Sequence, residues 1–179
     1  MKAGMIGLGL AVALLGGGVV QAAAAHQARD AREARAEIKD ANGRTVAHAT
    51  LTQEADGLRL RVTGASGLPE GVHGIHIHTT GRCDGPDFAS AGGHWNPTGH
   101  QHGSLNPQGQ HMGDLPNFAI DHRGHGSLEA TIAGGMLHGG ANPLLDADGA
   151  AVVVHAGSDD YRTDPAGNSG GRIACGVIG

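Results

Sequence analysis

The stretch TVAHATLTQEADGLRLRVT occupies residues 45–63 and contains two segments in which apolar and polar side chains alternate, residues 45–51 and 58–63. Alternation with a period of two is typical of a β-strand that buries one face. The Asp56-Gly57 pair between the segments is a turn signal. We therefore expect these residues to form an antiparallel hairpin, the basic unit of an all-β protein.

The same pattern continues on both sides of this hairpin. Upstream, residues 36–39 precede an Asn42-Gly43 turn, and the polar residues 27–36 favour a short helix at the start. Further strands are expected at residues 118–121, 126–132 and 150–154. The 33 glycines and the aromatic content of 2% suit many turns between short strands. About eight strands in one domain predict a β-sandwich or a flattened eight-stranded barrel.

The N-terminus has the features of a targeting segment. Lys2 is followed by an apolar run from Met5 to Val20, and the small residues Ala23 and Ala25 suit a cleavage site. The alternative is a retained membrane anchor, but the run is shorter than the ~20 apolar residues that a spanning helix needs. We expect residues 1–25 to be a cleaved signal peptide and residues 26–179 to form one periplasmic or secreted domain outside the membrane.

Composition narrows the class of function. The net charge is −5 and becomes one unit more negative without Lys2, which argues against nucleic acid as a partner. The 13 histidines outnumber the 12 lysines and arginines, so metal binding is the first chemistry to consider. Cys83 and Cys175 are the two cysteines. In an exported chain they are expected to form a disulfide, with two buried thiols as the alternative.

Histidines recur in a pattern that favours a metal site. In GVHGIHIH, residues 71–78, the side chains of His76 and His78 lie on the same face of a strand. Residues 79–117 are rich in Gly, Pro, Asn, Asp and His and are too long for an ordinary connection. A single H-x-H pair is weak support for a metal site. The full set of candidate ligands is larger, and comprises His76, His78, His94, His102, His111, Asp114 and His155.

Five motifs give the chain a resemblance to the copper-zinc superoxide dismutase family, and to its bacterial periplasmic branch, over about residues 34–179. They are GVHGIHIH at 71, GGHWNP at 92, HMGDLPN at 111, VVVHAG at 152 and GGRIACGVIG at 170. The resemblance implies that the all-β domain is a Greek-key β-sandwich or flattened eight-stranded barrel with long metal-binding loops. It implies an enzyme that converts superoxide to O₂ and H₂O₂. It also implies two cofactors, a redox-cycling copper and a structural zinc.

The resemblance also implies a role for each candidate residue. The copper ligands would be His76, His78, His94 and His155, and the zinc ligands His94, His102, His111 and Asp114. His94 would bridge the metals, release from reduced copper and carry a proton to the product. Asp159 would link a ligand of each metal, and Arg172 would attract the anionic substrate. Nitrogen ligands alone suit copper, whereas three nitrogens and one oxygen suit zinc.

The sequence also allows another function and leaves several details undecided. An exported protein that binds copper or zinc without turnover would be a function of a different class. His73 is expected to hydrogen bond to the backbone, His100 to lie on the surface and Trp95 to serve packing. The residues at Thr79-Thr80 and the short segment 160–171 depart from the family pattern, which leaves the guidance of substrate open. The sequence does not decide between a monomer and a homodimer.

Overall fold

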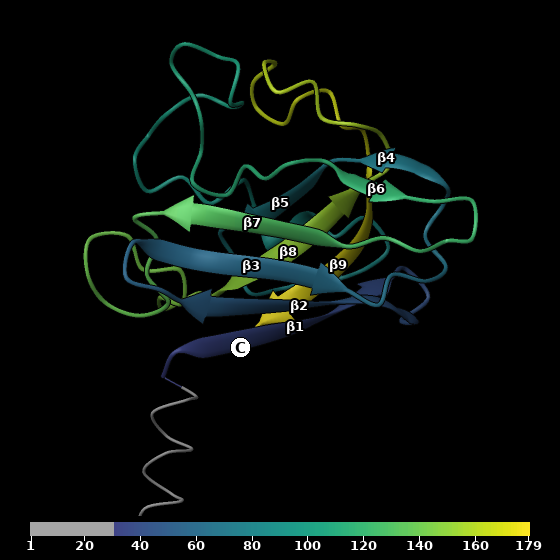
Figure 1. Cartoon of the computed structure of the whole chain (residues 1–179), viewed down its shortest axis with the longest axis horizontal. Helices are drawn as coiled ribbons and strands as arrows, with labels where there is room; N and C mark the ends of the chain where they lie inside the picture. The colour runs from purple at the N-terminus through teal and green to yellow at the C-terminus, as the bar shows by residue number, and fades with distance from the viewer. Residues whose placement is uncertain (1–30) are drawn as a thin grey trace, which may run out of the picture.

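The computed structural model describes residues 31–179 (Figure 1). The described chain forms nine strands and one turn of 3₁₀ helix. In chain order these are β1 (Glu33–Asp40), β2 (Thr45–Gln53), β3 (Gly57–Thr63), β4 (Gly71–His73), β5 (Ile75–His78), η1 (Ala89–Ala91), β6 (Phe118–Ile120), β7 (Leu128–Ala133), β8 (Ala150–His155) and β9 (Arg172–Ile178).

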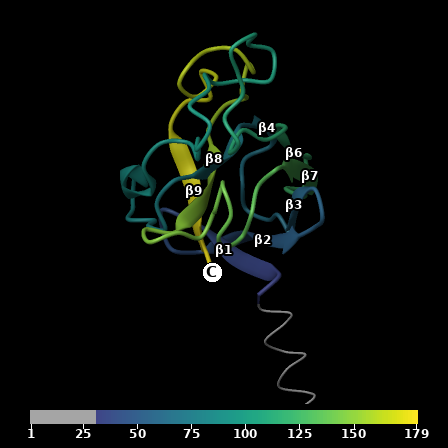
Figure 2. The same cartoon turned by 90° about the vertical axis from the view of Figure 1, so that its left-hand side faces the viewer.

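Seven of the strands form one antiparallel sheet in the order β5-β8-β9-β1-β2-β3-β7. The other two, β4 and β6, pair with each other as a ribbon. Because β4 leads directly into β5 and β6 leads into β7, the ribbon connects the two outer strands of the sheet. The sheet curls strongly into a half-barrel, which the two perpendicular views show (Figures 1 and 2). The predicted all-β fold of short antiparallel strands is confirmed.

The core follows from the alternation in the strands. In β3, Leu58, Leu60 and Val62 are buried, whereas Arg59 and Arg61 are exposed. Strand β8 differs, because all six of its residues are buried. Its two faces contact two separate apolar clusters: one is the main core, and the other contains Phe88, Ala91 and Cys175. The loop after β5 therefore covers the outer face of β8.

Two local predictions need correction. The favoured helix over residues 27–36 is wrong for residues 33–36, which begin β1 and pair with β2. The predicted leader, residues 1–25, lies outside the described residues. Strand β9 was not predicted. It pairs with both β8 and β1, and only one of its last five residues is exposed, so it shows no alternation.

The predicted disulfide between Cys83 and Cys175 is confirmed, and its two Cα atoms are 5.6 Å apart. It connects the loop after β5 to β9 across 92 residues of sequence. Closing a loop of that length stabilises a fold by roughly 4 to 5 kcal/mol in the chain-entropy treatment. Within residues 31–179, no helix is long and apolar enough to cross a bilayer.

Candidate metal centre

The long segment 79–117 reaches the metal centre by pairing with the outer edge of β5. Ile77 donates its backbone N–H to the carbonyl of Gly113 at 2.9 Å and accepts one from Trp95 at 2.8 Å. A Cβ atom at position 113 would lie 2.3 Å from the Ile77 carbonyl oxygen, so only glycine fits there. Through these bonds His94 and Asp114 come to lie opposite His78 and His76.

Four histidines converge on one point, and we call them the first group: His76, His78, His94 and His155. Each offers a ligand atom, and these atoms lie within 4.8 Å of one another. One nitrogen of each ring is buried without a hydrogen-bond partner, namely His76 Nδ1, His78 Nε2, His94 Nε2 and His155 Nε2. A buried polar atom without a partner is costly. Four of them around one point fit a metal ion that would accept their lone pairs.

Hydrogen bonds on the far side of three of these rings fix which nitrogen carries the proton. His78 Nδ1 donates to the carbonyl of Gly92 at 2.9 Å, and His155 Nδ1 donates to that of Gly170 at 3.1 Å. His76 Nε2 lies 2.7 Å from Asp159 Oδ2 and donates to it. Carbonyl oxygens can only accept, so the inward nitrogens of His78 and His155 keep their lone pairs. The rings are therefore oriented as metal ligands before any ion arrives.

Burial keeps these rings neutral. It lowers the pKa of His76 and of His155 to about 4, and the pKa of His78 to about 2. Repulsion from the other imidazoles acts in the same direction, and Arg172 adds to it at His78 and His155. The neutral imidazole is the form that binds metals. This half of the centre thus stays ready to bind at neutral pH.

A second group forms around the carboxylate of Asp114. Its Oδ1 atom lies 2.8 Å from His94 Nδ1, 3.0 Å from His102 Nδ1 and 3.2 Å from His111 Nδ1. Its Oδ2 atom accepts the backbone N–H groups of Gly103 and His111. Burial opposes ionisation of Asp114, but hydrogen bonds from the three histidines outweigh it and hold the pKa far below its usual range. His94 contributes to both groups, one nitrogen to each.

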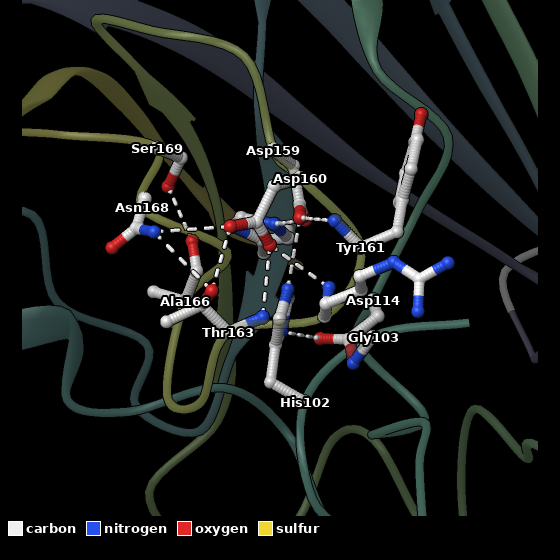
Figure 3. A network of polar contacts seen from close by, with 12 residues as sticks. His102, Gly103, Asp114, Asp159, Asp160, Tyr161, Thr163, Ala166, Asn168 and Ser169 are labelled. Carbon is white, nitrogen blue, oxygen red and sulfur yellow. Dashed lines mark hydrogen bonds and ion pairs between the residues drawn. The ribbon is translucent and has the colours of Figure 1, made fainter. Parts of the chain in front are cut away.

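Asp159 connects the two groups. Figure 3 shows it beside His102 of the second group. Its fully buried carboxylate accepts His76 Nε2 on Oδ2 and His102 Nε2, at 3.0 Å, on Oδ1. Burial would raise the pKa of Asp159, but these bonds lower it. The Asn117 side chain pairs with the Asp159 backbone in both directions, at 2.8 and 2.9 Å. Asn117 therefore sets the position of Asp159, a role that its place in the HMGDLPN motif did not reveal.

The loop after Asp159 is held closed by Asp160 (Figure 3). The carboxylate of Asp160 accepts the backbone N–H of Thr163 at 2.8 Å, the Thr163 hydroxyl at 2.7 Å and the Asn168 amide at 3.0 Å. The Asp160 N–H also bonds to the Gly167 carbonyl at 2.9 Å. This closure places Gly167 directly against Asp159. Sequence reasoning assigned no role to Asp160 or Gly167, because no spacing signal marks such a contact.

Arg172 lies at the start of β9, beside the first group. Its guanidinium donates to the carbonyl of Phe88 and to that of Gly92, each at 2.7 Å. The Gly92 carbonyl also accepts a hydrogen bond from His78, so the arginine and a candidate metal ligand share one hydrogen-bond acceptor. Burial lowers the pKa of Arg172, with Asp87 acting against it, and an arginine remains charged in proteins. The residue lines an open cavity of about 520 Å³.

Three residues near the ligands lie where the sequence predicted. His73 is buried, and its ring nitrogens lie 2.9 Å from the carbonyl oxygen of His155 and 3.0 Å from that of Pro69, which confirms a backbone contact. His100 is exposed, which confirms its surface position. Trp95 packs in the main core.

Residues 45–178 match the family described as copper/zinc superoxide dismutase (SODC). The chain belongs to this family. A copper-zinc superoxide dismutase of Aquifex aeolicus is 42% identical over 144 residues, which are 80% of this chain and 85% of the relative. The two side-chain groups match the copper and zinc sites of the family.

Solved structures of the superoxide dismutase family resemble the fold as well. The structure of a SOD-like protein from Bacillus subtilis is 37% identical, has a TM-score of 0.76 and covers 80% of this chain and 96% of its own. A Cu/Zn superoxide dismutase from Brucella abortus is 28% identical, has a TM-score of 0.63 and covers 82% of this chain and 99% of its own.

Replacing Gly167 by Ala should disturb the Asp159 bridge. A Cβ atom there would lie 1.8 Å from Asp159 Oδ1 and 2.8 Å from His102 Nε2. We expect Gly167→Ala to weaken metal affinity by about 10- to 100-fold, the usual effect of altering groups that hold metal ligands. Competition titrations with zinc and copper chelators measure it. Gly134→Ala is the matched control, since Gly134 has a similar positive φ but no atom within 4 Å. Equal affinities in the two variants would contradict the prediction.

Zinc binding should release a proton from His102. Burial lowers the pKa of His102, but its bonds to Asp114 and Asp159 outweigh this and raise it to about 9. The folded pKa exceeds the unfolded value of ~6.5. The proton therefore stabilises the metal-free fold fully below pH ~6.5, and this contribution is lost as pH rises through about 9. We expect zinc to displace about one proton at pH 7 to 8 and fewer above pH 9. Calorimetry in buffers of different ionisation enthalpy measures the number released, and a value near zero at pH 7 would contradict the assignment.

Proposed function

We propose that this protein disproportionates superoxide to O₂ and H₂O₂ at a copper ion held by His76, His78, His94 and His155. The observation that carries the proposal is the set of four inward-facing, buried ring nitrogens without partners. Copper, when bound, supplies the alternation between two oxidation states that removes an electron from one superoxide and gives it to the next. Two superoxide ions and two protons are consumed for each O₂ and H₂O₂ formed.

Three of the four side chains around the copper position would hold it without rearranging. The outward hydrogen bonds of His76, His78 and His155 fix each ring, so the donor atoms stay in place through the cycle. His94 has Nδ1 directed at Asp114 and Nε2 directed at the first group. It can hold a proton on Nε2 while Nδ1 stays engaged, and so can supply one of the two protons that peroxide formation consumes.

The second group is proposed to bind zinc through His94, His102, His111 and Asp114. Three nitrogens and one carboxylate oxygen are a usual donor set for a closed zinc site. The negative charge of Asp114 is stabilised there by three imidazoles, and a divalent cation would take over that role. The function of this group would be to hold His94 in position and to tie the long loop to the sheet.

Arg172 is proposed to attract superoxide and to dock it beside the copper position. A negatively charged chain repels a small anion on average, so a local positive charge must govern capture. Hydrogen bonds to the carbonyls of Phe88 and Gly92 hold the guanidinium of Arg172 in place. The Gly92 carbonyl also accepts the hydrogen bond from His78 Nδ1. Asp87 lines the same cavity, so the opening carries charges of both signs.

A metal-binding protein without turnover is the second candidate. One similar structure is that of a protein described as SOD-like, so family membership alone does not establish catalysis. A storage protein has no need of an arginine fixed beside its copper ligands or of two complete donor sets, and this chain has both. Superoxide consumption by the copper- and zinc-loaded protein, with and without a copper chelator, separates the candidates. A fully loaded sample that consumes no superoxide would exclude the enzyme.

We further propose export to the periplasm or beyond the cell, with cleavage after Ala25. The apolar run and the small residues at 23–25 support it. A disulfide, as found between Cys83 and Cys175, persists in oxidising compartments. The intact mass of protein recovered from the cell envelope should correspond to a chain that begins at or near His26. Recovery of a chain that begins at Met1 would contradict the prediction of a cleaved signal peptide.

Arg172→Ala should retain both metals and the fold, while kcat/KM falls about tenfold or more. Lysine should retain more activity than alanine, and glutamate less than either, because the sign of the charge is the proposed cause. Added salt should slow the wild type more than the Ala variant, since screening at ~0.15 M acts over about 8 Å. Pulse radiolysis across a salt series measures both effects.

Arg123→Ala is the matched control, because Arg123 is an exposed arginine in the turn between β6 and β7. It changes the net charge equally but does not line the cavity that Arg172 lines. If Arg172→Ala and Arg172→Glu, fully loaded, matched the wild type at low salt, Arg172 would not guide the substrate.

A further inference from the structure

A second cavity opens behind the proposed zinc group. It has a volume of about 380 Å³, and its lining includes His111 and Asp114 together with Thr98, His100 and Gln110. His111 and Asp114 retain 7% and 8% exposure, whereas His102 has none. The two residues of this group that line the cavity are therefore accessible to solvent from it. An ion that enters from this side meets His111 and Asp114 first.

His100, on the wall of this cavity, is unusually well held for an exposed side chain. The Asn96 side chain pairs with the His100 backbone in both directions, accepting its N–H at 3.1 Å and donating to its carbonyl at 2.8 Å. The ring nitrogen Nδ1 lies 3.1 Å from the Gln110 carbonyl oxygen. Four contacts thus fix both the backbone and the ring, since Thr98 Oγ1 also lies 3.4 Å from Nδ1.

The contact with Gln110 determines which nitrogen of His100 can bind a metal. A carbonyl oxygen only accepts, so Nδ1 must carry the proton. In the neutral ring the lone pair is then on Nε2, and an unprotonated ring nitrogen is a strong zinc ligand. Gln110 directly precedes His111 in sequence. The same short segment therefore fixes His100 and supplies a ligand of the proposed zinc group.

We propose that His100 is a capture ligand for zinc, which binds the ion transiently at the mouth of this cavity and passes it to His111 and Asp114. The inference rests on the proposed zinc site. A hydrated zinc ion must exchange its waters for protein ligands one at a time, and an imidazole at the mouth provides the first exchange. The buried carboxylate of Asp114 attracts the cation inward. Because His100 acts on the path and not at the final site, it changes the rates of uptake and release equally and leaves the affinity unchanged.

Zinc uptake by the metal-free full chain tests the proposal. Stopped-flow mixing with Zn²⁺ and a chromophoric zinc indicator gives the uptake rate, and transfer to excess chelator gives the release rate. His100→Ala and His100→Gln should both slow uptake and release at least threefold with an unchanged Kd. His122→Ala removes another exposed histidine, in the turn between β6 and β7 and outside the cavity lining, and should behave as the wild type. Native mass spectrometry counts the zinc bound at equilibrium.

Unchanged rates in both His100 variants would overturn the capture role, as would an equal slowing in His122→Ala. A loss of affinity that matches the loss in uptake rate would also overturn it, because His100 would then be a ligand of the resident ion. Wild-type protein that binds no zinc at equilibrium would instead refute the proposed zinc site itself. The equilibrium count therefore distinguishes the two failures.

Discussion

The buried carboxylate of Asp159 accepts hydrogen bonds from His76 and His102, one from each half of the metal centre. A carboxylate without solvent is stable only when such donors surround it. The same requirement fixes the orientation of both rings, because each has one nitrogen committed to Asp159 and the other directed at its own group. The two halves are thus mechanically coupled. A displacement of Asp159 would turn a ring in each half at once.

Electrostatics separates the halves that Asp159 connects. In the first group burial dominates, and the pKa values of His76, His78 and His155 are lowered. At His102, in the second group, burial also lowers the pKa, but the bonds to Asp114 and Asp159 outweigh it and raise the pKa. An uncharged nitrogen set suits an ion that changes its charge during turnover, whereas a set with a carboxylate suits a divalent ion of constant charge. The proposed division between copper and zinc follows from this difference.

The curled sheet makes the centre possible by leaving the outer edge of β5 for the long loop. Strand β5 supplies two histidines, and the loop that pairs with it supplies four further side chains of the two groups. The disulfide fixes the first part of this loop to β9, where Arg172 lies. The segment after Asp159 is short, and Asp160 closes it with hydrogen bonds of its own. This closure presses Gly167 against Asp159 and covers the bridge.

Prediction from sequence succeeded where the signal is local and failed where it is not. Period-two alternation revealed β2 and β3, because each buries one face. It missed β9, which lies between β8 and β1. The start of β1 was assigned to a helix, since its polar residues carry no trace of the pairing with β2 that orders them.

The sequence by itself supplied seven candidate metal ligands, the six histidines and Asp114, which are visible as residue types in the strand and in the long loop. The roles of Asp159 and Arg172 came from the resemblance to the family. Only the tertiary structure decided which ring nitrogen faces inward, because that depends on the carbonyls of Gly92 and Gly170. It alone placed Asn117, 42 residues away along the chain, and Gly167, 8 residues away, at Asp159. Such contacts have no sequence signature. The first depends on the meeting of two loops, and the second depends on how one loop closes on itself.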